Sequence, residues 1–531
     1  MVGVTMSCKT AISAHQFACT ARMLPLLLLL TLPEVLQAQV FYSDPFYYST
    51  NNNAVTILAY DGSGGAVSIP SIIASLPVTT VGANAFNLFN NSGAILTNVI
   101  IPDSVITIGT NAFGYCSNLT ILTIGTNVTS IDDEAFYNCT KLTGVTIPQS
   151  VASIGAEAFG SCTRLTGMTI PSAVTNIGTG VFSNCPSLMA ITVDKLNPVY
   201  SSFDGVLFNQ VQTTLIQSPQ GIVGAFVIPS GITTIMDQAF QYCSGLTSVT
   251  IPDTITSIGD QAFQYCGSLT SITIPDSVTN IGNSTFEYCT NLTSTTIGTN
   301  VTSIGDLDFS YDANLVTVTF PDGLTTIGDL SFNGCTSLSS AAIPDSVTTI
   351  GGWAFSGCGI TNLKIGNGVT SIGQRAFLGL TSLATSVTIP STVTNIGDYG
   401  FAVDWRVKAF FFQGNAPNIG PNTFWDDFNQ TVYYLPGTTG WTNFAQLAGI
   451  PTVLWNPQAQ TTDASFGVQS NQFGFNITGT ANIPIVVEAN TNLTQPSWTM
   501  LFNGTVTNGM VYFSDPQWVN YPDRFYRITS P

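Results

Sequence analysis

Apolar and polar positions alternate along this chain in a pattern that returns about every 23 residues, and the unit 248–270, SVTIPDTITSIGDQAFQYCGSLT, shows it clearly. Val249 and Ile251 alternate with polar neighbours, which is the period of a strand with one buried face. Pro252 cannot donate to a strand ladder, so we expect the strand to end there. The first quarter of each unit therefore predicts one short strand.

The rest of the unit predicts a second extended segment and then a turn. Ile255 and Ile258 point inward on the extended segment, and Gly259 closes it. Asp260 is placed to cap a single helical turn. The apolar residues expected to share one face of this turn are Ala262, Phe263 and Cys266.

A phenylalanine marks each copy of the unit. These markers are Phe86, Phe113, Phe136, Phe159, Phe182, Phe240, Phe263, Phe286, Phe309, Phe332, Phe355, Phe377, Phe401 and Phe424. A fixed period in the twenties indicates a solenoid, because one coil is too small to bury its own apolar face and must stack on its neighbours. Such a molecule offers a long surface for function.

The consensus, a strand followed by I-P-D-S-V-T-S-I-G-x-x-A-F-x-x-C-x-x-L, resembles the BspA-type leucine-rich repeats of bacterial surface and secreted proteins. The resemblance covers roughly residues 40 to 455. It implies a mainly β solenoid of 23-residue coils with parallel strands and short helical turns. It also implies a non-enzymatic protein that binds matrix proteins, other cells or host receptors.

Departures from the repeat divide the chain into segments. The expected segments are a signal peptide at 1–38, an N-terminal cap at 39–81, repeats at 82–404 with an irregular insertion at about 191–228, degenerate repeats with a C-terminal cap at 405–455, a linker at 456–462, and a small β-sandwich-like module at 463–531.

The first segment has the pattern of a secretory leader. Lys9 and Arg22 precede an apolar stretch at 24–32, and Leu36-Gln37-Ala38 offers a cleavage site before Gln39. A membrane anchor is the alternative, but about nine apolar residues are too few to span a bilayer. We expect an extracellular or surface-attached product without a membrane span.

The insertion carries turn signals at Asn197-Pro198 and Asp204-Gly205 between strand-like runs. It predicts either a hairpin or a longer coil. A recognition loop and a bulge packed on the solenoid are both consistent with this sequence.

Composition and charge exclude several classes of function. The chain has a formal net charge of −18, and only 8% of its residues are charged. A chain this acidic repels phosphate backbones, which excludes nucleic acid as a partner. The single histidine, His15, lies in the expected leader. A secreted product then lacks Ser-His-Asp chemistry and histidine-ligated zinc, and we expect no catalytic residue, metal or cofactor.

Cysteine recurs three residues after the marker phenylalanine. The column contains Cys116, Cys139, Cys162, Cys185, Cys243, Cys266, Cys289, Cys335 and Cys358. Stacked coils hold equivalent Cβ atoms about 4.8 Å apart or more, whereas a disulfide requires about 3.8 Å. We therefore expect buried free thiols that act as small apolar fillers, with disulfides as the alternative.

Tyrosine recurs just before this cysteine column in four consecutive units, at Tyr242, Tyr265, Tyr288 and Tyr311. Stacked coils would align the four rings into a stripe, and aromatic stripes bind protein partners or sugar rings. The alternative is that each ring only covers the turn of its neighbour. These four residues are the candidate interaction surface.

Threonine and aspartate form further columns. The threonines of the outer strand face are Thr146, Thr169, Thr192, Thr250, Thr273, Thr319 and Thr388. They suit an exposed strand, with ice binding as the alternative. The recurrent aspartates are Asp103, Asp253, Asp276, Asp322 and Asp345 after the proline, and Asp260, Asp306, Asp329 and Asp398 after the glycine. Turn and cap roles explain them, with a glycosidase pair or a calcium site as alternatives.

Together these patterns favour a secreted or cell-surface repeat protein that mediates protein–protein or cell-surface adhesion without catalysis. Its partner would be an extracellular protein or a cell-surface glycan. The alternative is a carbohydrate-binding or polysaccharide-degrading β-solenoid, and a third class is a structural surface-layer protein. The sequence does not set the oligomeric state.

Overall fold

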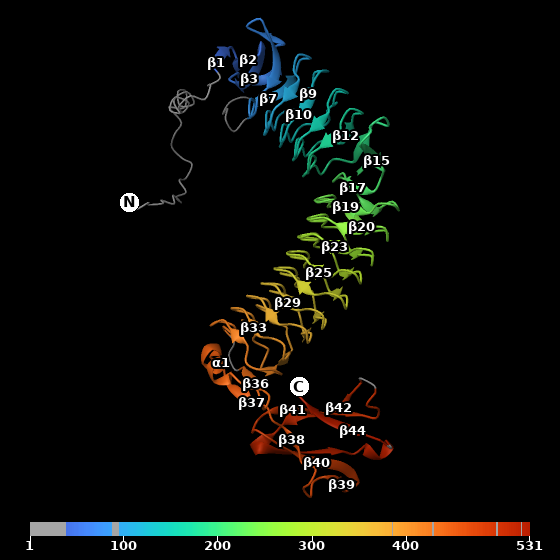
Figure 1. The fold of residues 1–531 in the computed structure, drawn as a ribbon, viewed down its shortest axis with the longest axis vertical. Helices are drawn as coiled ribbons and strands as arrows, with labels where there is room; N and C mark the ends of the chain where they lie inside the picture. Colours follow the sequence, from blue (N-terminus) through green and yellow to red (C-terminus); the bar gives the residue numbers. More distant parts are fainter. Residues whose placement is uncertain are drawn as a thin grey trace, which may run out of the picture.

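The structure is a computed structural model that describes residues 39–87, 95–384, 386–426, 430–494, 497–521 and 523–530. The chain forms a curved solenoid of stacked coils with a small β module at its C-terminal end (Figure 1). The expected signal peptide, residues 1–38, lies outside the described residues.

Almost every coil contributes its first strand to one long face of the solenoid. The strands of this column are β4 (Gly64–Ser68), β7 (Ile95–Ile100), β9 (Ile121–Thr123), β12 (Gly167–Ile170), β14 (Ala190–Val193), β18 (Gly224–Val227), β20 (Leu246–Thr250), β22 (Ser271–Thr273), β24 (Ser294–Thr296), β26 (Thr317–Thr319), β28 (Ser340–Ala342), β30 (Asn362–Lys364), β32 (Ser386–Ile389), β34 (Ala409–Phe412), β36 (Thr431–Tyr434) and β37 (Thr452–Leu454). Their pairing is parallel, as in Ile272 with Thr295 of the next coil.

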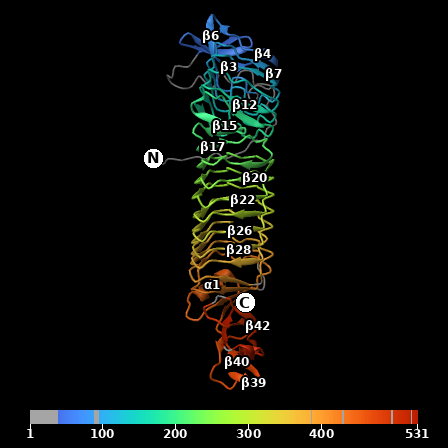
Figure 2. The same ribbon diagram turned by 90° about the vertical axis from the view of Figure 1, so that its right-hand side faces the viewer.

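The second strands are shorter and stack along another face, and the rungs are visible from the side (Figure 2). They are β6 (Leu76–Val81), β8 (Thr107–Ile108), β10 (Ser130–Ile131), β11 (Ser153–Ile154), β13 (Asn176–Ile177), β17 (Thr214–Gln217), β19 (Thr234–Ile235), β21 (Ser257–Ile258), β23 (Asn280–Ile281), β25 (Ser303–Ile304), β27 (Thr326–Ile327), β29 (Thr349–Ile350), β31 (Ser371–Ile372), β33 (Asn395–Ile396) and β35 (Asn418–Ile419). The predicted parallel solenoid is confirmed.

The turn after the second strand is not helical, and this part of the prediction is wrong. The amides of Gln261, Phe263 and Tyr265 donate to carbonyls of the next coil at 2.9, 2.8 and 2.9 Å. Gln261 and Tyr265 have φ of 56° and 61°, in the left-handed region, which a helical turn does not contain. Ala262 and Cys266 are fully buried all the same, because the alternating backbone still turns them inward.

The marker phenylalanines stack through the core in two runs, Phe86 to Phe182 and Phe240 to Phe424. Phe286 lies between Phe263 and Phe309, with ring centroids 5.4 and 5.3 Å apart. All the markers are buried, which confirms that the coils share one interior. No ring contact joins Phe182 to Phe240 in the described structure, so the stack is interrupted at the insertion.

The insertion forms a hairpin that is built into the solenoid. Strand β15 (Tyr200–Phe203) pairs antiparallel with β16 (Val206–Asn209), which pairs antiparallel with β17. Leu207 packs into the core of the N-terminal coils, whereas Val206 and Phe208 pack into the core of the C-terminal coils. The two apolar cores therefore meet at this hairpin.

Each end of the solenoid is covered. At the N-terminal end, β1 (Val40–Ser43), β2 (Phe46–Asn51) and β3 (Ala54–Tyr60) form an antiparallel meander on β6, and β5 (Ile72–Ile73) pairs with β6. Near the other end, helix α1 (Trp441–Ala448) buries Trp441 and Phe444. A C-terminal cap was expected at 405–455, but no helix was expected there. Trp405 and Trp425 are more than half exposed and do not cap the core.

The C-terminal module contains two small sheets. One is formed by β38 (Gln458–Ala459), β39 (Gly467–Gln469), β40 (Gln472–Thr478) and β43 (Met510–Asp515), and the other by β41 (Pro484–Asn490), β42 (Thr499–Thr505) and β44 (Phe525–Thr529), with short 3-10 turns at Thr507–Gly509 and Trp518–Asn520. The stretch 456–462, expected to be a linker, instead contains strand β38. The Nε1 group of Trp455 donates to the Pro484 carbonyl at 2.8 Å, which fastens the module to the last coil.

Candidate interaction surface

The four predicted tyrosines form one stack on the outside of the solenoid. The ring centroids are 4.8 Å apart from Tyr242 to Tyr265, 4.8 Å from Tyr265 to Tyr288, and 4.9 Å from Tyr288 to Tyr311. The planes differ by 10° at most, so the rings lie face to face. We call Tyr242, Tyr265, Tyr288 and Tyr311 the tyrosine stripe.

The backbone of the tyrosine stripe is held in an unfavourable conformation. All four residues have φ between 60° and 62°, a region that costs a residue with a Cβ atom roughly 1 kcal/mol or more. Other coils place residues that tolerate this region at the same position, such as Asn138, Asn184 and Gly334. Four consecutive tyrosines are therefore not explained by the preference of the backbone.

The stack determines which parts of the rings are accessible. Each inner ring has both faces covered by its neighbours, so Tyr265 and Tyr288 present edges and hydroxyl groups. Tyr242 is 37% exposed and Tyr311 is 45% exposed. The outer face of Tyr311 lies over Gly334, where an added Cβ would be 3.0 Å from the ring. Tyr242, at the other end of the stripe, lines a pocket together with residues of the N-terminal coils such as Tyr137 and Asn184.

The cysteine column is buried, as predicted, and its nine thiols are free. Burial raises the pKa of the Cys116 thiol to about 12 and that of Cys266 well above its ordinary value. The thiols of Cys116 and Cys266 are therefore protonated and unreactive in the folded chain.

Most of the recurrent aspartates bridge neighbouring coils rather than cap a turn within one coil. The Asp260 carboxylate accepts the amide of Asn283 in the next coil at 2.8 Å, and the Asp237 carboxylate accepts the amide of Asp260 at 2.9 Å. After the proline, Asp103 accepts the Thr126 amide at 2.7 Å, which lowers the pKa of the Asp103 carboxyl. These acids have a structural role.

A cationic group that the sequence analysis did not single out lies in another column. The Arg375 guanidinium is stacked between the rings of Trp353 and Tyr399, with its central carbon 4.7 Å from each centroid. These residues come from three consecutive coils. The arginine is engaged by two rings, so it stabilises the stack of coils.

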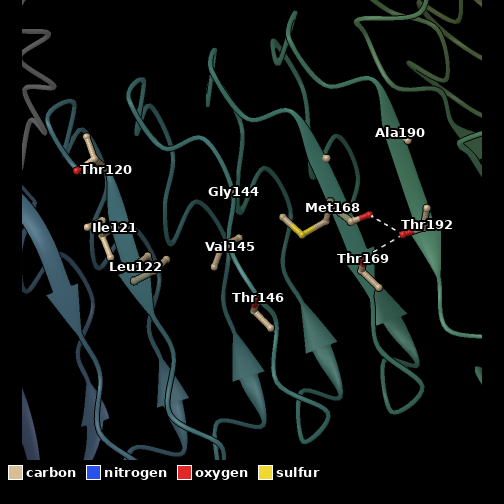
Figure 3. Close-up of a pocket in the computed structure, with 11 residues that line it drawn as sticks. Thr120, Ile121, Leu122, Gly144, Val145, Thr146, Met168, Thr169, Ala190 and Thr192 are labelled. Carbon is tan, nitrogen blue, oxygen red and sulfur yellow. Dashed lines mark hydrogen bonds between the residues drawn. The ribbon is translucent and has the colours of Figure 1, made fainter.

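A shallow hollow of about 550 Å³ lies on the face of the first strands (Figure 3). It is lined by Thr120, Ile121, Leu122, Gly144, Val145, Thr146, Gly167, Met168, Thr169, Ala190 and Thr192. Residues 144–146 form no strand, so the sheet is interrupted between β9 and β12. Gly144 and Gly167 contribute no side chains that would fill the hollow. The periodic sequence pattern alone did not predict it.

The hollow contains three of the predicted threonines. Thr146, Thr169 and Thr192 are exposed, and the hydroxyls of Thr169 and Thr192 lie 2.9 Å apart (Figure 3). Its lining combines apolar side chains with hydroxyls and has no titratable side chain. This chemistry suits a binding surface and offers no acid or base.

Within the described ranges, no three His, Cys, Asp or Glu side chains are grouped so that they could hold a metal ion. Nor does any helix of the described chain have the length and apolar character that a bilayer crossing requires.

Comparison with known proteins identifies the repeat. The family model described as BspA type leucine-rich repeat region, with 6 copies, matches residues 79–205, 222–329 and 307–431, which is more than half of the chain. The chain belongs to the BspA-type leucine-rich repeat family. Among curated proteins, none matches it.

Solved structures of bacterial repeat proteins are similar to this BspA-type chain. A leucine-rich repeat protein from Eubacterium ventriosum is 25% identical with a TM-score of 0.50, covering 64% of this chain and 93% of that chain. One from Bacteroides ovatus is 25% identical with a TM-score of 0.49, covering 78% and 100%. A leucine-rich cell surface protein from Faecalibacterium prausnitzii is 25% identical with a TM-score of 0.39, covering 71% and 95%. The first of these supports the same coil architecture.

Proposed function

We propose that this BspA-type protein is secreted or displayed at the cell surface, where it binds an extracellular protein through the tyrosine stripe. The observation that carries the proposal is the four-ring stack held at left-handed backbone positions. A conformational cost repeated in four coils indicates that the tyrosine side chains have a use.

The accessible parts of the rings favour a protein partner over a sugar along the stripe. Sugars stack on the faces of aromatic rings, but the faces of Tyr265 and Tyr288 are covered. Ring edges and hydroxyls in a regular row offer apolar contact beside hydrogen-bonding groups. Tyrosine is enriched in protein interfaces for this reason.

The leader-like pattern of residues 1–38 supports an extracellular location. The expected product begins at Gln39. Mass spectrometry of the N-terminal peptide of the exported protein tests this, and an intact N-terminus with the protein retained in the cytoplasm would contradict it.

The binding role is tested with the double variant Tyr265→Asn, Tyr288→Asn. Asparagine occupies the same position at Asn138 and Asn184, so the left-handed backbone is retained while both rings are removed. We expect the affinity for a matrix-protein partner, found by screening a panel of immobilised matrix proteins, to fall at least tenfold while the melting temperature changes little. Surface plasmon resonance measures the Kd of the variant and of the unaltered chain, and the loss of affinity would appear as a higher Kd of the variant.

The matched control is Tyr512→Asn, because Tyr512 is 43% exposed on β43, away from the stripe. Its affinity is expected to equal that of the unaltered chain. Equal affinities for the stripe variant and the unaltered chain would exclude the stripe as the binding surface.

A further inference from the structure

The insertion interrupts the regular bonding between turns. In the regular coil of Phe159, the amides of Glu157, Phe159 and Ser161 donate to carbonyls of the next turn at 3.1, 3.0 and 2.7 Å. The turn of Phe182 comes next, and the insertion follows it in sequence. The insertion contains no turn of this kind to accept hydrogen bonds from the Phe182 turn. In the described chain, the amide of Asn184 donates to no backbone carbonyl. We call this place the register break.

One side chain bridges the register break. The amide of Cys185 donates to Oε1 of Gln220, and Nε2 of Gln220 donates to the carbonyl of Gln241 at 2.9 Å. Gln220 is buried and takes the place of a missing turn. The turns of Phe182 and Phe240 are thereby held next to each other, although 58 residues separate them in sequence.

A pocket of about 280 Å³ opens on the outside of this bridge. The residues that line it are Tyr137, Glu157, Ser161, Ser183, Asn184, Gln238, Gln241 and Tyr242. They come from turns on both sides of the register break. The pocket therefore lies where the turns of Phe182 and Phe240 adjoin without the regular bonding between turns.

Two glycines keep the pocket open. Gly180 stands at the position that Glu157 and Gln238 occupy in their own coils, and a Cβ there would lie 3.1 Å from Oε1 of Gln238 and 3.7 Å from Cγ of Glu157. A Cβ at Gly160 would lie 2.9 Å from the ring of Tyr137 and 3.1 Å from Oγ of Ser183. The Tyr137 ring thus leans across Gly160 toward the break.

An aromatic ring stands on each side of the pocket. Tyr242 is the first ring of the tyrosine stripe, so its outer face is not covered by another stripe ring and is turned toward the pocket. Tyr137 lines the pocket from the N-terminal coils. Burial, followed by the nearby Tyr137 and Glu287, raises the pKa of Tyr242, which is consistent with the two phenols lying close together.

The polar groups of the pocket select against anionic and apolar ligands. Each lining side chain carries a hydroxyl, amide or carboxyl group, and none is basic. The amide nitrogens of Gln238 and Gln241 donate to Gln261 and Gln264 at 3.0 and 2.6 Å. Their Oε1 atoms remain available as acceptors. An anion would meet Glu157 without a compensating cation, and an apolar molecule would leave these groups unpaired.

A neutral polyol ring satisfies all of these conditions. We propose that the register-break pocket binds one pyranose ring of a glycan, stacked on the outer face of Tyr242. Sugar hydroxyls would pair with the carboxyl of Glu157 and the amides of Gln238 and Asn184. Pockets for drug-sized ligands hold about 300–1,000 Å³, so a pocket just below this range suits a single ring. This site goes beyond the protein-binding role and does not depend on it.

The experiment is saturation-transfer NMR on the chain from residue 39, with free glucose, galactose, mannose and N-acetylglucosamine as probes. We expect transfer to the ring protons of at least one sugar. Gly180→Gln fills the pocket with the side chain that the equivalent positions 238 and 261 carry, and we expect at least a tenfold loss of affinity. Gln238→Ala removes an acceptor and is expected to weaken binding as well.

Gly357→Gln is the matched control, because Gly357 has φ of 68° and open space around its Cβ position, far from the pocket. It should bind sugar as the unaltered chain does. The stripe variant Tyr265→Asn, Tyr288→Asn should also keep sugar binding, which separates this proposal from the proposed function. Absence of transfer to all four sugars, or transfer that folded Gly180→Gln retains, would overturn the pocket proposal.

Discussion

The thiol of Cys266 donates a hydrogen bond of 3.2 Å to the carbonyl oxygen of Phe240, one coil earlier in the stack. The same bond, at 3.0–3.4 Å, is made by all but one of the other cysteines of the column, which are Cys116, Cys139, Cys162, Cys185, Cys289, Cys335 and Cys358. The cysteine thus fills space and also links neighbouring coils.

This link predicts an order of stability for two variants of Cys266. Cys266→Ala removes the sulfur and the donor, and we expect a loss of about 1–2 kcal/mol in the free energy of unfolding. Cys266→Ser keeps a donor aimed at the Phe240 carbonyl, so its loss should be smaller. Chemical denaturation followed by circular dichroism measures both, and a serine variant no more stable than the alanine variant would show that the bond contributes nothing.

The coil of Phe309 has Asp312 at the cysteine position, fully buried. Burial raises the pKa of Asp312 well above its ordinary value, and burial also raises that of the neighbouring Asp308 to about 7. Above pH 4 and below the raised pKa values, both carboxyl groups are therefore favoured in the protonated form. A protonated Asp312 can donate a hydrogen bond, as the cysteine thiol does in the other coils.

These two acids predict that stability falls as the pH rises. The folded chain binds more protons than the unfolded chain between the ordinary pKa near 4 and the raised value, so the free energy of unfolding decreases over that interval. For Asp308 the interval ends at about pH 7, and its contribution is on the order of 4 kcal/mol. Thermal unfolding from pH 4 to pH 8 should show a falling melting temperature.

Asp312→Cys places the cysteine of the other coils at this position and removes one of the two buried acids. We expect its melting temperature to exceed that of the unaltered chain by several degrees at pH 8 and to differ little at pH 4. The exposed Asp253→Asn variant serves as the control and should follow the unaltered chain at both pH values. An equal gain at pH 4 and pH 8 would mean that the effect is packing alone.

The carboxylate bridge between coils is tested at Asp260. Asp260→Ala leaves the amide of Asn283 without its acceptor, and we expect a loss of about 1 kcal/mol, as for a lost helix cap. Asp253→Ala removes an exposed carboxyl of the other aspartate column and should change stability by less than about 0.5 kcal/mol. Equal effects of the two variants would contradict a specific role for the bridge.

Gln220 predicts how strongly the two cores are joined. Gln220→Ala leaves the amide of Cys185 and the carbonyl of Gln241 unpaired in a buried place, and we expect a loss of about 2–3 kcal/mol. Amide hydrogen exchange should become faster mainly in the coils of Phe182 and Phe240, which would locate the loss of stability there. Gln210→Ala, at an exposed position of the hairpin, is the control, and uniform faster exchange along the whole chain would contradict a local bridge.

The repeating part of the fold was predictable because each coil meets the same neighbours. The columns of Phe263 and Cys266 are buried as expected, since both follow from apolar positions at a fixed period. The helical turn was wrong because Ala262, Phe263 and Cys266 have the spacing of a helix face. The contrary signal was the glycine and asparagine at equivalent positions, such as Asn138 and Gly334, which mark left-handed backbone.

The candidate sites were predictable only in part. Alignment of the tyrosines follows from the period, but the coverage of their faces depends on ring orientation. The register-break pocket was not predictable, because no periodic pattern says which turns adjoin when one is skipped. Helix α1 was not predicted, although Gly440 and Gly449 flank it, because residues 405–455 were interpreted only as degenerate repeats and a cap.

Stacking with a constant offset, as in the pairing of Ser257 with Asn280, means that each boundary between regular coils is interchangeable with the next. A gene that gains or loses one whole coil through recombination would therefore keep both caps and every remaining contact. Such a change between Tyr242 and Tyr311 would alter the number of tyrosine rings in the row. The register-break pocket beside Gln220 would remain a single site. The number of rings in the tyrosine stripe can therefore change without changing the number of pockets.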